Sequence, residues 1–239
     1  MACDQGNYAK GRIFLEESLL LSRELNDKHL IGYALNHLGR IAFEQDDPLT
    51  ARSYYEEGLP LLRETGNKPG VAWLLNNLGA IASSQGDHLR ARPYFEESLK
   101  LHREVGNKQG MALALDNLGL GALSRNDFVA AQQFHQESLA LFYELGDKQG
   151  IVYGLEGLAS LAHIQEKAED AARLLGTASA LRESIGFVVP PREQENYTKK
   201  INTTREKLGA HVFALAWAEG RAMTLTQMAD LALCLKRNE

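Results

Sequence analysis

Several features that define other protein classes are scarce in this sequence. Its 239 residues contain two cysteines, Cys3 and Cys234, near opposite ends of the chain. This spacing excludes a disulfide framework and a cysteine metal site, so a reducing, cytoplasmic setting is the default expectation. No apolar run approaches the roughly 20 residues needed to cross a bilayer, and the start, MACDQGNYAK, lacks the apolar core of a signal peptide. We therefore predict no membrane association.

Positive charge is also scarce. Lys and Arg total 26 against 31 for Asp and Glu, which gives a net charge of -5. A general nucleic-acid binder needs a basic face, so direct nucleic-acid binding is not expected. The nearest basic run, TKKINTTREK at 198–207, is interrupted by apolar and acidic residues. It is typical of a solvated helix face.

Catalytic and cofactor motifs are missing as well. The seven histidines show no HExxH spacing, and the chain contains no GxSxG elbow and no GxxxxGK[ST] phosphate loop. The pair Gly119-x-Gly121 is too short for a dinucleotide fingerprint. Glutamate pairs such as Glu96-Glu97 recur along the chain, which is typical of a solvated face because catalytic acids are expected once. We therefore predict no enzyme activity, no metal and no cofactor.

What the sequence does contain is an internal repeat of 40 residues, which aligns with itself without gaps. One half of the repeat reads RIFLEESLLLSRELND (12–27), RSYYEEGLPLLRETGN (52–67), RPYFEESLKLHREVGN (92–107) and QQFHQESLALFYELGD (132–147). The other half ends in HLGRIAFEQDD (37–47), NLGAIASSQGD (77–87), NLGLGALSRND (117–127) and GLASLAHIQEK (157–167).

Each half of the repeat has helical spacing and its own stop signal. Ala91, Phe95 and Leu99 follow one helical face. Gly66-Asn67 places a C-terminal glycine before a residue that can cap the next helix, and the aspartate at 87 can cap the other helix in the same way. Each repeat is therefore predicted to be two antiparallel helices of about 17 residues.

Small residues recur at fixed positions, and they carry a resemblance to a known family. Leu78-Gly79, then Ala91 and Phe95, with Ser98 in the last small position, resemble the tetratricopeptide repeat. The long period is similar to the variety found in kinesin light chains and in maltose-type bacterial regulators. The resemblance implies an all-α fold, a right-handed superhelix of antiparallel helix pairs over residues 1–186. We expect the small residues to let helix backbones approach closely.

After residue 186 the period fails, and a C-terminal helical cap is predicted over 187–239. Helices are expected at about 191–207, 210–222 and 224–236, the last with Thr224 and Gln227 as a capping box. The apolar residues Phe213, Leu215 and Trp217 are expected to seal the end of the array. Together with the preceding helix, this region resembles the tails of bacterial regulators that join a switch ATPase, and often a LuxR-type DNA-binding domain, to a tetratricopeptide array.

The first residues raise a question about the N-terminal end. MACDQGN (1–7) matches IASSQGD (81–87), so the chain begins inside the last turns of a helix. Its partner helix, about 8–25, carries Ile13, Leu15 and Leu19 rather than a polar cap. We expect this chain to be a fragment of a longer protein. The alternative is a homodimer in which the uncapped helix packs against a second copy.

The family register predicts a concave groove lined by columns of residues 40 positions apart. The candidate ligand- or peptide-binding residues are Tyr33, Asn36, His37, Arg40, Trp73, Asn76, Asn77, Leu113, Asp116, Asn117, Tyr153 and Glu156. Aromatic side chains offer large contact area, and asparagine amides can bind a peptide backbone. In similar repeats the matching asparagines contact peptides, which implies that role for Asn77 and Asn117. Helix bridging is an equal alternative for both asparagines, and Trp73 can also be packing.

The sequence thus predicts a scaffold that binds a protein or peptide partner, as the sensor segment of a larger bacterial signalling or transcriptional regulator. The alternative is a domain that senses a small-molecule effector and controls an upstream switch ATPase. Asp116 and Glu156 make one end of the groove acidic, which favours a basic ligand.

Overall fold

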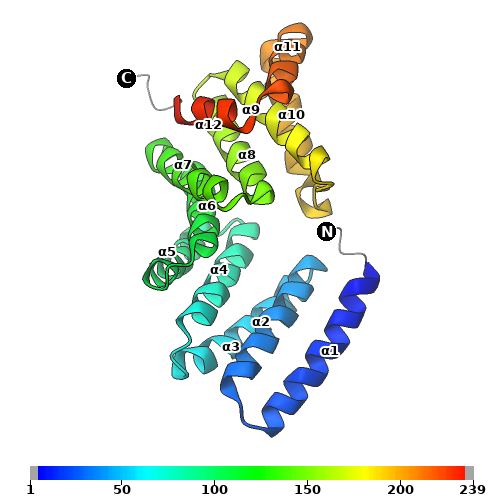
Figure 1. Cartoon of the computed structure of the whole chain (residues 1–239), viewed down its shortest axis with the longest axis vertical. Helices are drawn as coiled ribbons and strands as arrows, with labels where there is room; N and C mark the ends of the chain where they lie inside the picture. Colours follow the sequence, from blue (N-terminus) through cyan, green and yellow to red (C-terminus); the bar gives the residue numbers. More distant parts are fainter. Residues whose placement is uncertain (1–4, 235–239) are drawn as a thin grey trace. The chain divides into compact units, whose positions relative to one another are not determined.

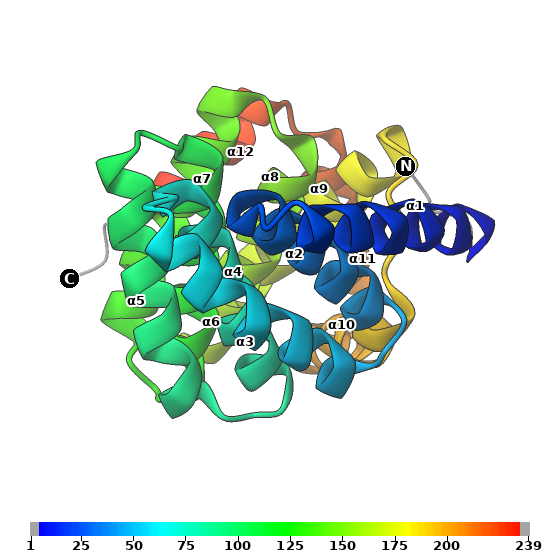
Figure 2. The ribbon, with the colours of Figure 1, turned by 90° about the horizontal axis from the view of Figure 1, so that it is seen from below.

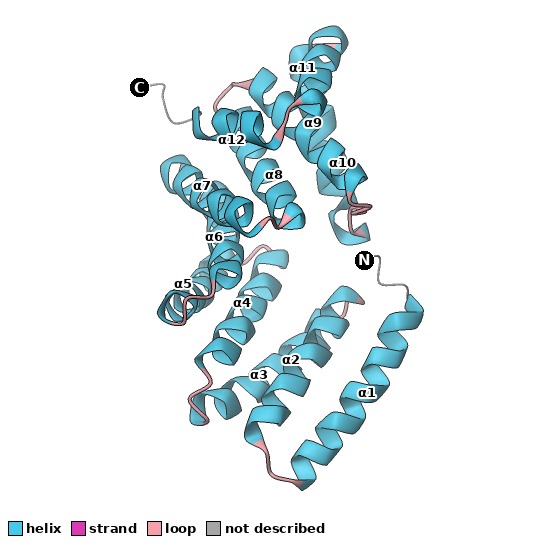
Figure 3. Ribbon diagram, viewed as in Figure 1, coloured by secondary structure: helices cyan, strands magenta, loops and turns pink. Residues whose placement is uncertain are grey.

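A computed structural model describes residues 5–234, and every regular element in this range is an α-helix (Figures 1 and 3). The helices are α1 (Gln5–Glu24), α2 (Lys28–Glu44), α3 (Pro48–Glu64), α4 (Lys68–Ser84), α5 (His88–Glu104), α6 (Lys108–Ser124), α7 (Phe128–Leu145), α8 (Lys148–Ile164), α9 (Ala168–Ser184), α10 (Pro191–Leu208), α11 (Ala210–Ala222) and α12 (Leu225–Cys234). Consecutive helices form antiparallel pairs, which confirms the predicted all-α fold. The chain divides into two compact units within α6, one ending at Asn117 and the other beginning at Leu118.

The helix length and the turn chemistry predicted from the repeat are confirmed. The helices α2 to α6 are each 17 residues long. Asn67 caps α4 by accepting a hydrogen bond from the backbone N–H of Gly70 at 2.9 Å, and Asp87 caps α5 in the same way through Arg90 at 3.0 Å. The glycine before Asn67, Gly66, has a φ of 67°, the left-handed conformation that ends the preceding helix.

The repeated glycines make room for side chains rather than for backbones, which corrects the expectation from the sequence. A Cβ atom on Gly39 would lie 2.4 Å from the ring of Tyr55, and one on Gly79 would lie 2.6 Å from the ring of Phe95. Gly39 of α2 and Gly79 of α4 therefore each receive an aromatic ring from the following helix. Tyr55 is 1% exposed.

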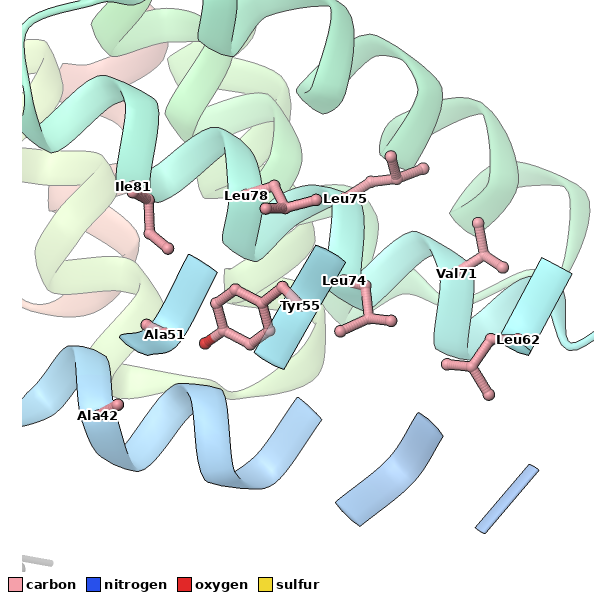
Figure 4. Close-up of a cluster of buried hydrophobic side chains, with 9 residues drawn as sticks. All are labelled: Ala42, Ala51, Tyr55, Leu62, Val71, Leu74, Leu75, Leu78 and Ile81. Carbon is pink, nitrogen blue, oxygen red and sulfur yellow. The ribbon is translucent and has the colours of Figure 1, made fainter. Parts of the chain in front are cut away.

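The Tyr55 ring lies in a core cluster of the N-terminal unit (Figure 4). Tyr55 and Leu62 project from α3 into a cluster with Leu74 and Leu78 of α4. The full cluster consists of Ala42, Ala51, Tyr55, Leu62, Val71, Leu74, Leu75, Leu78 and Ile81. Burying a large apolar side chain contributes roughly 1.5–3 kcal/mol, so this cluster stabilises the packing of α3 against α4.

The predicted helix at the N-terminus is present as α1, which lies alongside α2 (Figure 1). Leu19 is buried against α2, whereas Ile13 is 62% exposed. The expectation that residues 1–7 end a separate helix falls partly on residues 1–4, which lie outside the described residues. For residues 5–7 it is wrong, because Gln5, Gly6 and Asn7 already belong to α1.

The C-terminal unit ends in the predicted helices, and here the backbones do approach closely. A Cβ atom on Gly220 of α11 would lie 2.0 Å from the carbonyl oxygen of Arg173 in α9, and one on Gly176 of α9 would lie 2.4 Å from that of Trp217. The hydroxyl of Thr177 donates a 2.8 Å hydrogen bond to the Gly220 carbonyl at this crossing. The two glycines therefore fix the α9–α11 contact.

Two detailed predictions for this region have different outcomes. The capping box is confirmed, because the Thr224 N–H donates to the Gln227 side chain at 2.9 Å and the Gln227 N–H donates to the Thr224 hydroxyl at 3.3 Å. Phe213 is buried and Trp217 packs beside it against α9. The prediction for Leu215 is wrong, because its side chain is 54% exposed.

Candidate functional site

Pairs of asparagines connect the helices that carry the predicted groove positions. The side-chain amide of Asn77 in α4 donates to the Asn36 oxygen of α2 at 2.9 Å. One repeat later, the amide of Asn117 in α6 donates to the Asn76 oxygen of α4 at 3.3 Å. Of the two roles left open by the sequence, helix bridging is therefore present for Asn77 and Asn117. Both are half-buried, and one such bond uses only part of the capacity of an amide.

The aromatic column combines packing with exposure. Tyr33 is 36% exposed, and its ring centroid lies 4.8 Å from that of His29 one turn earlier. Trp73 is half-buried, with its ring centroid 4.9 Å from that of the buried His102, in an edge-on arrangement. Leu113 of α6 is also half-buried. These side chains thus support their neighbours and keep part of their surface open to solvent.

His37 and Arg40 lie at the surface of α2, one and two turns after Tyr33. Neighbouring atoms shield the His37 ring from part of the solvent, and this desolvation, with the positive charge of Arg40, lowers the pKa of His37. The lowered pKa favours the neutral form of the His37 ring, and Arg40 carries the positive charge of this pair. We use the name ladder face for a set of exposed or half-buried side chains on α2, α4 and α6, namely Tyr33, His37, Arg40, Trp73, Asn77, Leu113 and Asn117.

The acidic positions of the predicted groove are buried. Asp116 is 9% exposed, and Glu156 is 8% exposed. The Glu156 carboxylate accepts a hydrogen bond from Nε of Arg182 at 2.9 Å, which balances its charge. The expectation of an exposed acidic end that attracts a basic ligand is therefore corrected for both carboxylates.

Arg182 is the residue of this region that sequence reasoning missed. Its side chain is 4% exposed, and its guanidinium lies 5.7 Å from the ring centroid of Tyr153, 4.6 Å from that of Phe187 and 5.6 Å from that of Tyr197. Within the described part of the chain, its Nη1 and Nη2 atoms are buried without a hydrogen-bond partner. A signal was available, because Arg182 stands 40 residues after the buried Phe142, where an apolar residue is expected.

The cage around Arg182 accounts for the last aromatic of the predicted column. Tyr153 is half-buried and packs edge-on against Phe187, with 5.7 Å between ring centroids. Burial raises the pKa of the Tyr197 phenol, with a smaller contribution from the Glu156 carboxylate. The rings attract the guanidinium through their π faces, which offsets part of the cost of burying it. This arrangement holds the segment after α9 against α8.

Side chains suited to metal binding do not gather in the described range. Among residues 5–234, no three His, Cys, Asp or Glu side chains lie close enough to hold a metal ion. A hollow on α10 is lined by polar residues of that one helix, including Gln194, Thr198 and Asn202. None of the helices in the described range is both long enough and apolar enough to span a bilayer.

Comparisons with known proteins agree with this architecture. A family model described as "Tetratricopeptide repeat" matches residues 1–64 and 70–144, more than half of the chain. Among solved structures, the chain is similar to the crystal structure of BtubC (BKLC) from P. vanneervenii, with a TM-score of 0.64 and 16% sequence identity, over 97% of this chain and 93% of that chain. At this identity the likeness shows the fold alone. No curated protein matches the chain.

Proposed function

Because this chain belongs to the tetratricopeptide repeat family, whose domains are generally non-catalytic scaffolds that bind proteins or peptides, we propose that its ladder face holds a peptide segment of a protein partner. One observation carries the proposal: Tyr33, Trp73 and Leu113 stand at the same repeat position of α2, α4 and α6 and keep part of their surface exposed. Tyrosine and tryptophan side chains such as Tyr33 and Trp73 often dominate the binding energy at protein interfaces.

The amides of the ladder face suit an extended peptide. Asn77 and Asn117 are held by their bonds to the equivalent helix of the preceding repeat, so a ligand meets them already oriented. A preorganised donor or acceptor loses less entropy on binding than a mobile one. The amides would bond to a peptide backbone, and Trp73 would contact its side chains.

The test is a selection of peptides that bind the wild-type chain, followed by affinity measurements with variants. A Tyr33→Ala/Trp73→Ala variant is expected to weaken binding at least tenfold, since two aromatic contacts are lost. Asn77 is left intact because its loss would also break the bridge to Asn36. Circular dichroism checks that the variant is folded, and Tyr33→Ala alone, at a position 36% exposed, provides a second measurement.

A matched control comes from the other helices of the same unit. Leu49 and Leu89 are 72% and 76% exposed on α3 and α5, away from the ladder positions. Leu49→Ala/Leu89→Ala removes a similar amount of exposed apolar surface and is expected to leave peptide affinity unchanged. If Tyr33→Ala/Trp73→Ala and Leu49→Ala/Leu89→Ala lost the same amount of peptide affinity, the ladder face would not be the binding surface.

Small-molecule sensing is the second candidate function, and the cage around Arg182 favours it. Two guanidinium nitrogens of Arg182 are buried without a partner in the described part of the chain, and such atoms often mark a bound water or ligand. A small carboxylate or phosphate would complete their hydrogen bonds if Phe187 moved aside. The test is the shift in Tm on adding acetate, citrate or inorganic phosphate at constant ionic strength. A shift that Arg182→Leu abolishes supports sensing, and no shift removes this candidate.

We further propose that the chain works as the binding segment of a larger bacterial regulator, with residues 187–239 as a cap on the array of residues 1–186. The support is the resemblance of the sequence from α9 onward to the tails of such regulators. The sequence of the full gene tests this: a switch ATPase or a DNA-binding domain in the same chain is the expected result.

A further inference from the structure

The outer side of α1 exposes an unusual amount of apolar surface. Its exposed large apolar side chains are Ile13 (62%), Phe14 (69%), Leu20 (59%) and Leu21 (51%), followed by Leu25 (75%) just after the helix. The opposite side of α1 packs on α2 through Leu19. Figure 1 shows α2 beside α1 and no other helix of the N-terminal unit on its far side. Exposed apolar surface on this scale marks an interaction site.

Later repeats show what these positions do when they are covered. Phe14 and Leu21 correspond to Tyr54 and Leu61, which pack against the cluster formed by the preceding helices α1 and α2. The same two positions one repeat later are Tyr94 and Leu101, which pack against the next cluster. The outer side of α1 therefore has the side chains of a helix-packing face.

The charges at the two ends of this face fit a second copy of this chain as the partner. If two α1 helices lie antiparallel with Glu17 at the centre, Ile13 faces Leu21 of the second copy and Phe14 faces its Leu20. Lys10 then faces Glu24 of the second copy, and the same ion pair forms at the other end by symmetry. A face that is complementary to itself under a two-fold rotation is the requirement for an isologous dimer.

We propose that two copies of the chain associate through an antiparallel α1–α1 contact in this register. The contact extends along a helix of 20 residues, about 30 Å long. Apolar side chains lie on both sides of the central Glu17, and a base and an acid face each other at both ends. The antiparallel orientation also places the helix dipoles in opposition, which is favourable. This proposal is independent of peptide binding at the ladder face.

The first test measures the oligomeric state of the chain by analytical ultracentrifugation over a range of concentrations. The wild type is expected to be a dimer, and Phe14→Glu/Leu21→Glu is expected to be a monomer that keeps the wild-type circular dichroism. Leu49→Glu/Leu89→Glu is the matched control, because it adds the same charges at positions 72% and 76% exposed on α3 and α5. It should remain a dimer.

A wild-type chain that stays monomeric up to about 100 μM would overturn the proposal, since interfaces of useful affinity form well below 1 mM. The exposed face would then belong to a different helical partner. Dimers in all three proteins would also overturn it, by placing the contact elsewhere. Peptide affinity in the Phe14→Glu/Leu21→Glu variant should match the wild type, so failure of this proposal and failure of the ladder face are distinguishable.

A charge exchange tests the register. Lys10→Glu and Glu24→Lys are each expected to weaken the dimer roughly twofold to tenfold, because each breaks both exposed ion pairs. The double exchange should restore the affinity. Residues 10 and 24 lie about 21 Å apart along one helix, so only pairing between copies can restore it. A double variant no tighter than the single variants contradicts the antiparallel arrangement.

Glu17, the residue at the centre of the contact, gives an independent test of the register. Two Glu17 side chains approach each other at the two-fold axis, and their like charges oppose association. Glu17→Gln is therefore expected to tighten the dimer, whereas Glu16→Gln, on the same turn but bonded to Arg12 at 2.8 Å, should leave it unchanged. A Glu17→Gln variant that weakens the dimer would contradict this register.

Discussion

Helix ends in this protein depend on single residues with a left-handed backbone. Gly66, Gly86 and Gly106 hold φ values of 67°, 79° and 67° at these turns, where glycine meets no steric cost. Asn126 adopts the same conformation with a φ of 59°, which asparagine tolerates. Glu166 does so with a φ of 64°, and glutamate is poorly suited to it. One turn of the repeat therefore stores local strain.

Replacing Glu166 with glycine should release that strain. Glu166→Gly is expected to raise the free energy of unfolding by about 1 kcal/mol, since the left-handed conformation costs roughly 1–2 kcal/mol for most residues. The side chain is 86% exposed and reaches Lys207 only at 3.9 Å, so little else is lost. Urea denaturation measures the change. Gly86→Ala, the reverse exchange at a matching turn, should be destabilising, and a loss of stability in Glu166→Gly would contradict the explanation.

A second residue-scale feature is a histidine in an apolar position. His102 is fully buried, where the repeat places Leu62 and Phe142, and both of its ring nitrogens lack a hydrogen-bond partner among the described residues. Burial lowers the pKa of His102 to about 4. The folded chain therefore holds a neutral imidazole next to Trp73, and protonation of that ring opposes folding.

His102→Leu is predicted to change how stability depends on pH. Above the unfolded pKa of 6.5 the His102 ring is neutral in the folded and unfolded states, so it does not lower the free energy of unfolding. As the pH falls from 6.5 to about 4, the unfolded chain takes up a proton that the folded chain excludes. The wild type should then lose up to about 1.4 kcal/mol per pH unit that His102→Leu does not lose.

Urea denaturation between pH 7.5 and 4.5 measures this difference. His211→Leu, at an exposed position of α11, is the control and should keep the wild-type slope. Equal slopes in the wild type and His102→Leu would show that the His102 ring is not held neutral.

At the scale of elements, the C-terminal helices are positioned where the repeat loses its surface charge. Glu16, Glu56 and Glu96 share one position of the repeat, which becomes Gln136 and then Gly176. The Gln136 side chain donates to the Ala232 carbonyl of α12 at 2.8 Å, and Gly176 contacts α11. This break in the pattern was a signal in the sequence for where the cap packs.

The pair of Arg182 in α9 and Glu156 in α8 gives the element-scale prediction. Arg182→Leu or Glu156→Asn alone leaves one buried charge unpaired, which costs about 3–5 kcal/mol. The double variant restores the combination that the first repeat has at Leu62 and Asn36, and it should be clearly more stable than the sum of the single changes implies. A double-mutant cycle by urea denaturation measures the coupling, and purely additive losses would contradict a structural ion pair.

At the scale of the whole molecule, contacts within each of the two compact units hold the chain together. In repeat proteins each pair of helices contacts mainly its neighbours, so stability is a sum of local terms. A substitution deep in one unit should therefore act locally. The α9–α11 crossing is a suitable place to test this, because Gly220 has no room for a side chain.

Gly220→Ala is predicted to accelerate amide hydrogen exchange in α9 and α11 and to leave α2 to α4 unchanged. The added Cβ would lie 2.0 Å from the Arg173 carbonyl oxygen, so α11 must move from α9. Mass spectrometry of exchanged peptides measures the effect by segment. Gly79→Ala, which collides with Phe95, is the converse change in the other unit. Accelerated exchange throughout the chain in either variant would indicate one cooperative unit.

The sequence by itself determined the helices, their lengths, their caps and the 40-residue register of the repeat. These follow from short-range rules: helical periodicity, turn residues such as Gly66 and capping residues such as Asn67 act within a few positions. Repetition made each rule visible several times. The tertiary structure decided which polar groups meet and which side chains stay exposed. Arg182 meets Glu156 across 26 residues, and Leu215 stays outside a seal that Phe213 enters, because both outcomes depend on how separate helices pack.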